Sequence, residues 1–288
     1  MCRPKRRLSE CRRGNGREMA SPGEVRPRRL VILPIFNEEA MLEKVLTDLL
    51  PRVDLAIAVN DASTDRTREI LEEWRRRTGK LIIVNCRRNA GASTALRKGY
   101  LLVAYLLEQG KISPDDLVVE MDADGQHDPR YLTILCDHYQ TRANEVDVVL
   151  GRRDFRVYPK YKIFGNWLLT SAASVLGGMR YRDVESNFRV MPAKHFADLL
   201  RWYGGYRYSG AFEVGIILGR LGFRTDNSVL IDVPLYRHGA GWLDGFHVLW
   251  MGLRAWGRMI FRRPVSDNEK LLEETIAETS FPEENNVL

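Results

Sequence analysis

Apolar residues between Arg29 and Gly151 fall into two kinds of block that alternate along the chain. Short continuous apolar runs are typical of strands buried on both faces of a sheet, and longer segments with apolar residues at helical spacing are typical of covering helices. The expected strands span residues 29–36, 54–60, 81–85, 115–122 and 146–151. The expected helices span residues 37–50, 61–77, 92–109 and 129–140. This order predicts an α/β fold, a mostly parallel sheet with helices on both faces.

The alternation loosens after Gly151, but no linker divides the chain before residue 240. Further helices are expected at 163–177, 193–203 and 211–221, around short strands near 187–191 and 228–233. We therefore expect one α/β domain at 29–240.

Charge is concentrated at the two ends of the 288-residue chain, whose formal net charge is +6. Residues 1–29 hold ten Lys/Arg and three Glu, whereas residues 264–288 hold one Lys and seven Asp/Glu. These compositions predict a disordered basic tail at 1–28 and a disordered acidic tail at 264–288. Attachment of the basic tail to anionic lipid and translation starting at Met19 are alternatives for the first segment. Because the excess of positive charge comes mainly from a tail rather than from a basic globular surface, we expect no nucleic-acid partner.

Residues 241–263 predict a C-terminal amphipathic helix. Its apolar positions recur at helical spacing, and Arg254, Arg258 and Arg262 follow one another at i, i+4 and i+8. A basic helix of this kind suits the plane of an anionic bilayer, although packing of its apolar face on the domain is the ordinary alternative. No apolar run reaches the roughly 18 residues that a spanning helix needs. We expect peripheral attachment to the cytoplasmic membrane face.

The four cysteines form no CxxC pair, and the N-terminal region has no apolar secretion signal. Both features favour a reduced chain that faces the cytosol.

Polar residues follow all five expected strands of the first half. They are Asn37-Glu38, Asn60-Asp61, Asn89-Ala90-Gly91, Asp122-Ala123-Asp124 and Gly151-Arg152-Arg153. Ligands bind beyond the carboxyl ends of strands in an open parallel sheet, so this arrangement predicts a nucleotide or phosphate site. Taken singly, Asp61 could be a helix cap and residues 89–91 an ordinary turn.

The segment Asp122–Pro129 (DADGQHDP) carries the strongest local signal. Residues i and i+2 of an extended segment point to the same side, so Asp122 and Asp124 can present their carboxylates together. Two such carboxylates favour Mg²⁺ or Mn²⁺, which bind one or two carboxylates plus substrate phosphate oxygens. A solvated acidic turn is the alternative, and we expect His127 to be a turn residue rather than a ligand. The chain lacks G-x-G-x-x-G after the first strand and G-x-x-x-x-G-K-[ST], which disfavours dehydrogenases and P-loop enzymes.

Six segments in a fixed order resemble glycosyltransferase family 2 and, within it, the dolichyl- and polyprenyl-phosphate mannose or glucose synthases. They are PIFNEE at 34–39, VNDASTDRT at 59–67, RNAGASTALRKG at 88–99, DADGQHDP at 122–129, GRR at 151–153 and DVESNFR at 183–189. The resemblance runs from about Arg29 to Arg237. It implies a GT-A fold that takes a hexose from a nucleotide-diphosphate sugar and transfers it with inversion to a polyprenyl phosphate.

The resemblance also implies roles for individual residues. Those implied to contact the base and ribose are Pro34, Asn37, Glu38 and Asp61. Those implied to hold the metal are Asp122, Asp124 and Gln126, above a floor shaped by Asn89 and Gly91. Arg153 matches an arginine that faces the acceptor phosphate. Asp183 and Arg189 match a pair lining the same cleft, where an ion pair between them is as good an account of Arg189 as contact with the donor.

The acceptor decides whether a general base is needed. A phosphate monoester, with a second pKa of about 6, is largely dianionic near neutrality and can attack without a base. A sugar hydroxyl needs a carboxylate within hydrogen-bond reach, and Glu213 is the obvious candidate. Binding of the donor sugar and a helix cap are the alternatives for Glu213. We take Asp124, Arg153 and Glu213 as the candidate catalytic residues.

Two departures from the family pattern concern the acceptor side. The chain has Ser186-Asn187-Phe188-Arg189 where the lipid-phosphate synthases have Ser-Gly-Phe-Arg, and residues 237–242 replace their Arg-x-x-Gly-x-Ser-Lys. Three alternatives therefore stay open: a family-2 enzyme with a saccharide or other hydroxyl acceptor, a sugar-phosphate nucleotidyltransferase, and a binding module without catalysis.

Overall fold

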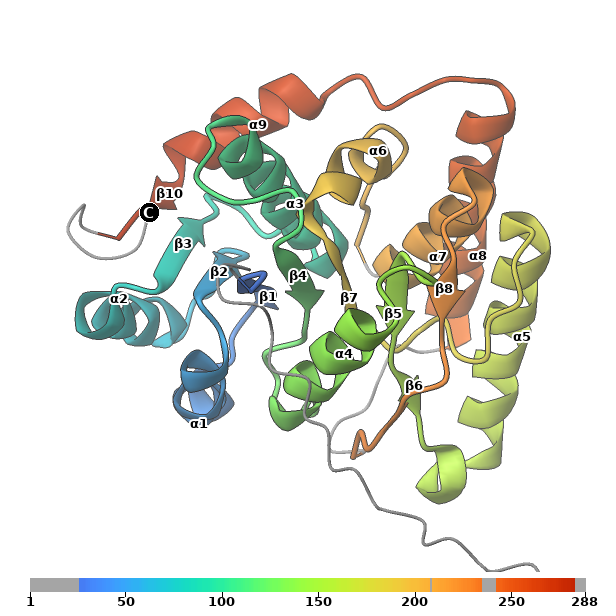
Figure 1. The fold of residues 1–288 in the computed structure, drawn as a ribbon, viewed down its shortest axis with the longest axis horizontal. Coiled ribbons are helices and arrows are strands. Elements are labelled where there is room, and N and C mark those ends of the chain that lie inside the picture. Colours follow the sequence, from blue (N-terminus) through green and yellow to red (C-terminus); the bar gives the residue numbers. More distant parts are fainter. Residues whose placement is uncertain (1–25, 208, 235–241, 283–288) are drawn as a thin grey trace, which may run out of the picture.

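The structure is a computed structural model that describes residues 26–207, 209–234 and 242–282. Eight strands form one mixed sheet in the spatial order β10-β3-β2-β1-β4-β7-β5-β8 (Figure 1). They are β1 (Arg29–Ile35), β2 (Leu55–Asn60), β3 (Leu81–Asn85), β4 (Leu117–Glu120), β5 (Val148–Leu150), β7 (Arg189–Pro192), β8 (Thr225–Asp226) and β10 (Thr279–Ser280). A second, two-stranded sheet pairs β6 (Arg152–Arg153) with β9 (Leu230–Ile231).

The connections between strands are mostly helical. The α-helices of the described residues are α1 (Glu39–Leu49), α2 (Thr67–Thr78), α3 (Ala92–Glu108), α4 (Arg130–Thr141), α5 (Lys160–Gly177), α6 (Phe196–Leu200), α7 (Gly210–Leu221), α8 (Trp242–Ile260) and α9 (Asn268–Ala277). Short 3₁₀ turns lie at η1 (Leu50–Arg52), η2 (Phe155–Val157) and η3 (Ala193–His195).

The sheet is mostly parallel, as predicted. β1 pairs in parallel with β2 and β4, and β2 pairs in parallel with β3. β7 lies between β4 and β5 and is antiparallel to both, so β5 runs in the same direction as β4. The carboxyl ends of β1 to β5 therefore meet at one edge of the sheet, where the polar segments of the sequence are found.

Helices cover both faces of the sheet, and the alternation of side chains along β1 shows how. Leu30 and Ile32 pack in a core with α3, α6 and α7, whereas Val31 and Leu33 pack in a second core with α1, α2 and α4. Because the β1 side chains of both cores are buried, the strand is continuously apolar, as in a sheet covered on both sides. The fold class predicted from the sequence is confirmed.

Helices α5, α7 and α8 pack against one another beside this sheet (Figure 1). Residues 210–218 of α7 are all buried. A third core of apolar side chains, including Phe212, Ile216 and Val248, lies among the three helices. The helix expected at 241–263 is thus present as α8, while its role at an interface stays a prediction.

The acidic tail expected at 264–288 is ordered over residues 264–282, so that prediction is wrong for this segment. Helix α9 packs on α3, and β10 pairs antiparallel with β3. The acidic residues have basic partners on α3: Asp267 pairs with Arg97, and Glu278 pairs with Lys98 at 2.5 Å. The acidic residues that make this segment resemble a solvated tail therefore compensate basic residues of α3.

The basic tail expected at 1–28 lies outside the described residues up to position 25. Its last residues are paired, since Arg26 contacts Asp54 at 3.1 Å and Arg28 contacts Asp116 at 3.0 Å. The loop at 237–242, apart from the backbone of its last residue, also lies outside the described residues. No helix in the described part of the chain is long and apolar enough to cross a bilayer.

Candidate active site

The loop that follows β4 carries the two acidic residues on which the predicted metal site depends. The Asp122 backbone N–H donates to Nδ1 of His127 at 3.0 Å, and the His127 ring stacks on Phe188 with centroids 4.8 Å apart. Burial lowers the pKa of His127 to about 4, so the ring is neutral and able to accept this bond. His127 therefore holds the turn, as the sequence predicts.

The Asp124 carboxylate lies close enough to Asp122 to influence the ionisation of Asp122. Burial and the neighbouring Asp124 carboxylate raise the pKa of Asp122 to about 7. The Asp124 carboxylate accepts two hydrogen bonds from Gln126, from its backbone N–H at 2.9 Å and from Nε2 at 2.8 Å. Gln126 thus orients Asp124, and its role as a third ligand stays a prediction.

This pair fits a divalent cation that shares its coordination with a substrate. Two like-charged carboxylates lower their mutual repulsion when a cation lies between them. Mg²⁺ and Mn²⁺ normally take one or two protein carboxylates and leave the other positions to water and phosphate oxygens. Within residues 26–282, as far as they are described, no group of three or more His, Cys, Asp or Glu side chains is placed to bind a metal.

The carboxyl end of β2 is fixed to the loop after β3 by Asp61. Its two carboxylate oxygens accept the backbone N–H groups of Ala90 at 2.9 Å and Gly91 at 2.7 Å, and Asn89 Nδ2 donates to the Asp61 carbonyl at 3.2 Å. Asp61 is only 2% exposed. It therefore shapes the floor of the site together with Asn89 and Gly91, whereas its predicted contact with a base is not supported.

Gly91 is required by its surroundings. Its φ is +91°, and a Cβ atom there would lie 2.8 Å from Cα of Arg207. The loop before α7 thus crosses directly over the floor of the site, and Ser93 N–H donates to the Arg207 carbonyl at 2.8 Å. Any larger side chain at position 91 displaces this loop.

The residues predicted to bind the nucleotide at the end of β1 lie at the same edge. Asn37 adopts a φ of +54°, and its side-chain oxygen accepts the Thr64 backbone N–H at 2.8 Å. The Glu38 backbone N–H donates to Thr67 Oγ1 at 2.9 Å, and Pro34 is half-buried within β1. These contacts join the loops after β1 and β2 into one wall, and the nucleotide contacts of the three residues stay predictions.

Arg153 is paired with Asp183, which corrects the predicted Asp183–Arg189 pair. Arg153 Nε and Nη2 each donate to the fully buried Asp183 carboxylate at 2.9 Å, and Nη2 also donates to Asn166 Oδ1 at 2.7 Å. This bidentate geometry neutralises the guanidinium and holds it on the rim of the site.

Arg189 instead pairs with Glu120, a residue that the sequence analysis missed. The two lie directly opposite each other on β7 and β4, with Nε and Oε2 2.9 Å apart. Both are about 1% exposed, so the predicted contact of Arg189 with the donor is not supported. A lone glutamate in the apolar run Leu117–Met121 was the available signal, because a charge there needs a buried partner.

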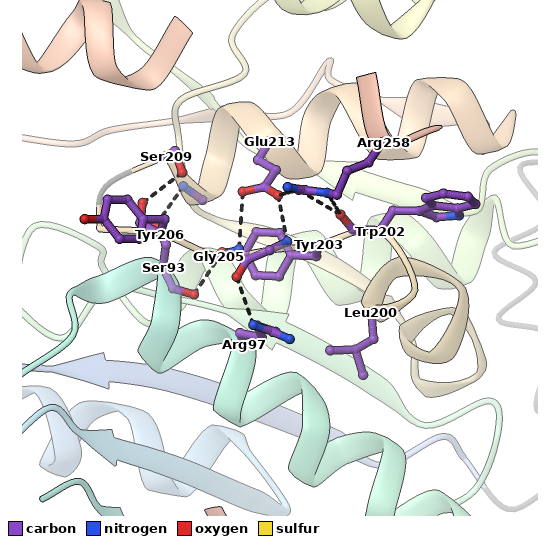
Figure 2. Close-up of polar contacts among 12 residues, drawn as sticks. Ser93, Arg97, Leu200, Trp202, Tyr203, Gly205, Tyr206, Ser209, Glu213 and Arg258 are labelled. Atoms are coloured by element: carbon purple, nitrogen blue, oxygen red, sulfur yellow. Dashed lines mark hydrogen bonds and ion pairs between the residues drawn. The ribbon is translucent and has the colours of Figure 1, made fainter. Parts of the chain in front are cut away.

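Glu213 is also a structural residue rather than an exposed base (Figure 2). Its carboxylate accepts the backbone N–H of Gly204 at 2.7 Å and of Gly205 at 3.3 Å, and it forms an ion pair with Arg258 of α8. The side chain is fully buried, and burial raises the pKa of its carboxyl group. These contacts fix the loop at Gly204 and Gly205 and join it to α8; the predicted helix cap is absent, because no side chain caps the start of α7, and the role as general base is not supported.

An arginine-lined cavity of about 500 Å³ adjoins Arg153. Arg152, Arg156 and Arg182 line it together with Arg153, Asp154, Phe155 and Leu230. Asp154 compensates Arg156, whereas Arg152 and Arg182 have no ion pair within the described part of the chain. The sequence analysis assigned a role only to Arg153, although the spacing of Arg152, Arg153 and Arg156 was a signal of clustered basic charge.

The edge of the sheet where β1 to β5 end therefore contains some of the predicted residues and lacks others. Pro34, Asn37, Asp122, Asp124, Gln126 and Arg153 lie in the loops and strand ends that meet there. Asp61, Asn89 and Gly91 lie beneath them, while Arg189 and Glu213 are buried in ion pairs.

The comparison with known families gives one match, Glycosyl transferase family 2, over residues 30–197. A dolichyl-phosphate N-acetylglucosaminyltransferase of Methanococcus voltae is 27% identical over 207 residues, 65% of this chain and 78% of the relative. An undecaprenyl-phosphate mannosyltransferase of Micrococcus luteus is 28% identical over 184 residues, 60% of this chain and 68% of the relative.

Among solved structures, glucosyl-3-phosphoglycerate synthase of Mycobacterium tuberculosis, in complex with Mn²⁺, UDP-glucose and phosphoglyceric acid, superposes with a TM-score of 0.57. The two chains are 19% identical, and 80% of each is covered, so this likeness concerns the fold. With a matched family profile over more than half of its length, this chain belongs to glycosyl transferase family 2.

Proposed function

We propose that this protein is a divalent-metal-dependent, inverting hexosyltransferase that uses a nucleotide-diphosphate sugar and a polyprenyl phosphate at the cytoplasmic membrane face. One observation carries the proposal: the coupled carboxylates of Asp122 and Asp124 lie at the carboxyl end of β4, close to the arginines that follow β5. Relatives named for transfer to dolichyl phosphate and undecaprenyl phosphate support the acceptor class.

Asp122 and Asp124 would hold Mg²⁺ or Mn²⁺ against the diphosphate of the donor. A cation bound there supplies positive charge that stabilises the departing nucleoside diphosphate. Gln126 keeps Asp124 in position through its two hydrogen bonds. The loop bound to Asp61 supplies a rigid floor beneath the donor.

The arginine-lined cavity would bind the acceptor phosphate. Asp183 already neutralises Arg153, so the net positive charge available to a phosphate comes mainly from Arg152 and Arg182. Guanidinium groups bind phosphate through charge-assisted hydrogen bonds, and they fix its orientation. We therefore assign acceptor recognition to these two arginines and a positioning role to Arg153.

The transfer itself needs no general base. A dianionic phosphate oxygen forms a bond to the anomeric carbon on the side opposite the diphosphate, and the bond from that carbon to the diphosphate breaks. The products are the glycosyl lipid phosphate and the nucleoside diphosphate. The buried, paired state of Glu213 agrees with this scheme and disfavours the hydroxyl-acceptor alternative.

A screen of radiolabelled nucleotide sugars tests the proposal. Each sugar is incubated with a polyprenyl phosphate and Mg²⁺ or Mn²⁺, and label extracted into organic solvent is counted. We expect transfer with one donor, loss of transfer with chelator, and release of a nucleoside diphosphate. Release of pyrophosphate from a nucleoside triphosphate and a sugar phosphate would instead identify a nucleotidyltransferase.

A soluble phosphorylated acceptor is the second candidate. The fold neighbour crystallised with phosphoglyceric acid favours it, because a phosphate-bearing acceptor of that kind would suit the same arginine-lined cavity. Adding phosphoglyceric acid to the same assay separates the two candidates. A labelled water-soluble product, separated from the unreacted nucleotide sugar by anion-exchange chromatography and formed only when this acid is present, would support the soluble acceptor. Absence of label from the organic phase in the same assay would overturn the lipid acceptor.

A further inference from the structure

The segment that leads into β7, residues 185–187, carries three polar side chains with unpaired atoms. Glu185 Oε1, Ser186 Oγ and Asn187 Oδ1 are each buried and have no hydrogen-bond partner in the described part of the chain. The large majority of buried polar side-chain atoms in folded proteins are hydrogen-bonded, and an unpaired one is destabilising. Three consecutive residues with this property point to a partner that the chain itself does not supply.

This segment lies beside the predicted metal site. Continuing the antiparallel register of β4 and β7 by two residues places Asn187 opposite Asp122. The Asn187 side chain reaches the Asp122 carboxylate and favours its charged form. At the other end of the segment, the Glu185 carboxylate acts on Arg153, which lines the arginine-lined cavity. Residues 185–187 therefore link the place where a cation would hold the donor diphosphate to the cavity that we assign to the acceptor.

Asn187 adopts a backbone conformation that glycine favours. Its φ is +52°, in the left-handed region, and it stands where the lipid-phosphate synthases have glycine. Glycine would adopt this conformation without strain, although asparagine tolerates it better than most residues. A side chain kept in such a conformation at a candidate active site indicates a use for the amide.

The unpaired oxygens of Asn187 and Glu185 are hydrogen-bond acceptors, which limits the ligand to one that donates. The diphosphate of the donor and the phosphate of the acceptor present mainly acceptor oxygens, and the Glu185 carboxylate would repel them. Hexose hydroxyl groups donate, and the anomeric carbon has to lie between the diphosphate and the acceptor phosphate for transfer to occur. Both side chains are half-buried, and their terminal torsions are soft, so a small rotation can bring each oxygen to a hydroxyl.

We propose that residues 185–187 form the subsite for the hexose of the donor, in which Asn187 and Glu185 accept hydrogen bonds from sugar hydroxyl groups and so select the sugar. This inference rests on the proposed function, because it needs a nucleotide-diphosphate sugar at the carboxylate pair. A site built to hydrogen-bond a hydroxyl rejects a ligand that lacks it, since the polar atoms of the site then stay unpaired. The metal and the arginines would recognise groups common to all such donors and acceptors, and these two side chains would distinguish one hexose from another.

Calorimetric titration of the full chain tests the subsite without turnover. The probes are UDP-glucose, UDP-N-acetylglucosamine and GDP-mannose, each compared with its own nucleoside diphosphate, with saturating Mn²⁺ and no acceptor. For the best-bound sugar we expect Asn187→Gly to raise Kd about ten-fold and Glu185→Ala to raise it about ten-fold or more. The Kd of the nucleoside diphosphate should change by less than about two-fold in either variant. Asn187→Gly should fold like the wild type, because glycine suits the φ of this position.

Asn144→Gly is the matched control. It removes the same side chain at an exposed position after α4 and should leave both dissociation constants unchanged. Deoxy analogues of the best-bound donor then test for a direct contact. The analogue that lacks the hydroxyl bound to Asn187 should have about the same Kd for the wild type and for Asn187→Gly, because neither complex contains that hydrogen bond.

Three results would overturn the inference and leave the proposed function standing. The first is binding and transfer of the nucleotide sugar by Asn187→Gly and Glu185→Ala at wild-type levels. The second is an equal loss of affinity for the nucleotide sugar and the nucleoside diphosphate, because the segment would then act on the cation or the diphosphate. The third is a deoxy series in which every analogue still distinguishes the wild type from Asn187→Gly. Wild-type protein that neither binds nor transfers any of the three sugars would instead overturn the proposed function, and the inference with it.

Discussion

Two groups of acidic residues in this molecule have opposite surroundings. Glu213 lies between α7 and α8, where two backbone N–H groups and Arg258 compensate its charge. Asp122 and Asp124 lie after β4, where burial and the neighbouring Asp124 carboxylate raise the pKa of Asp122 to about 7. Glu213 stabilises the fold. Asp122 and Asp124 have no ion pair with a Lys or Arg among the described residues.

This difference separates structural from functional charges more sharply than residue type does. A buried carboxylate with a matched cation and hydrogen bonds is a closed arrangement that leaves nothing for a ligand. Binding of a cation to a carboxylate pair with unbalanced charge lowers the free energy of the pair. The same contrast exists among the arginines, where Arg153 is neutralised by Asp183 and Arg182 is not.

The largest expected effect follows from Asp124→Asn. Removing one of the two carboxylates should lower metal-dependent turnover by about a hundred-fold or more, because several kcal/mol of charge stabilisation is lost in the transition state. The melting temperature should not fall, since the change relieves repulsion with Asp122. Turnover is measured by transfer of radiolabel, and melting by calorimetry.

Asp128→Asn is the matched control for this experiment. Asp128 lies in the same loop but is compensated by Arg130. It should retain turnover within a few-fold of the wild type. Full activity of Asp124→Asn, or activity that persists in the presence of chelator, would contradict the assignment of the uncompensated pair as the metal site.

Glu213→Ala should have its main effect on stability. The change leaves Arg258 without its carboxylate and two backbone N–H groups unpaired, which costs about 3–5 kcal/mol for a buried pair. The free energy of unfolding from urea titration measures this. Glu213→Gln keeps the shape and one acceptor oxygen but loses the charge and the second acceptor, so it should cost less than Glu213→Ala and should retain measurable turnover.

A different outcome for Glu213→Gln would break the comparison. If turnover disappears while the free energy of unfolding is unchanged, Glu213 acts chemically, and a hydroxyl acceptor with a general base becomes the better reading of the site.

Arg153 and Arg182 extend the comparison to basic residues, for which we expect smaller effects on turnover. Arg182→Ala should raise the acceptor KM by about ten-fold, equal to about 1.4 kcal/mol, with little change in stability. Arg224→Ala, an exposed arginine compensated by Asp147, is the control and should leave KM unchanged. Arg153→Ala should instead destabilise the fold, because it leaves the buried Asp183 uncompensated. A KM effect confined to Arg153→Ala would contradict our assignment of the acceptor phosphate.

The smallest expected effect concerns Glu185, whose pKa burial raises to about 7. Folded protein therefore retains a proton on Glu185 that unfolded protein releases above its ordinary pKa of about 4.5, and stability falls as pH rises from about 4.5 to 7. Glu185→Gln lacks this titration, so its free energy of unfolding should exceed that of the wild type at pH 8, and by little at pH 4.5. Urea titrations at the two pH values measure the difference. Equal differences at both would show that Glu185 does not titrate in this range.

The sequence predicts those parts of the fold and site that depend on local patterns. The five parallel-running strands follow from their apolar runs, and Asp122 and Asp124 share a loop because a single residue separates them. The partner of Arg189 could not be found in this way. It depends on β7 lying between β4 and β5, which brings Glu120 rather than Asp183 opposite the arginine.

That residues 264–282 are ordered could not be predicted, for the same reason. Asp267 lies 170 residues from its partner Arg97 in sequence, so composition shows the acidic residues without the basic ones that balance them. Glu213 likewise lies 45 residues from Arg258, on another helix. Compensation of charge over such separations is a property of the folded chain, and local patterns do not contain it.

The antiparallel pairing of β10 with β3 has a consequence for biosynthesis. Glu278, next to β10, accepts a hydrogen bond from the backbone of Arg87, 191 residues earlier, so the ribosome makes β3 long before the strand that covers it. Through that interval the apolar strand Leu81–Asn85 has an open edge, a template for pairing with other nascent chains. Pairing with β10 therefore closes an edge of the sheet that stays open for as long as residues 279–280 have not been made.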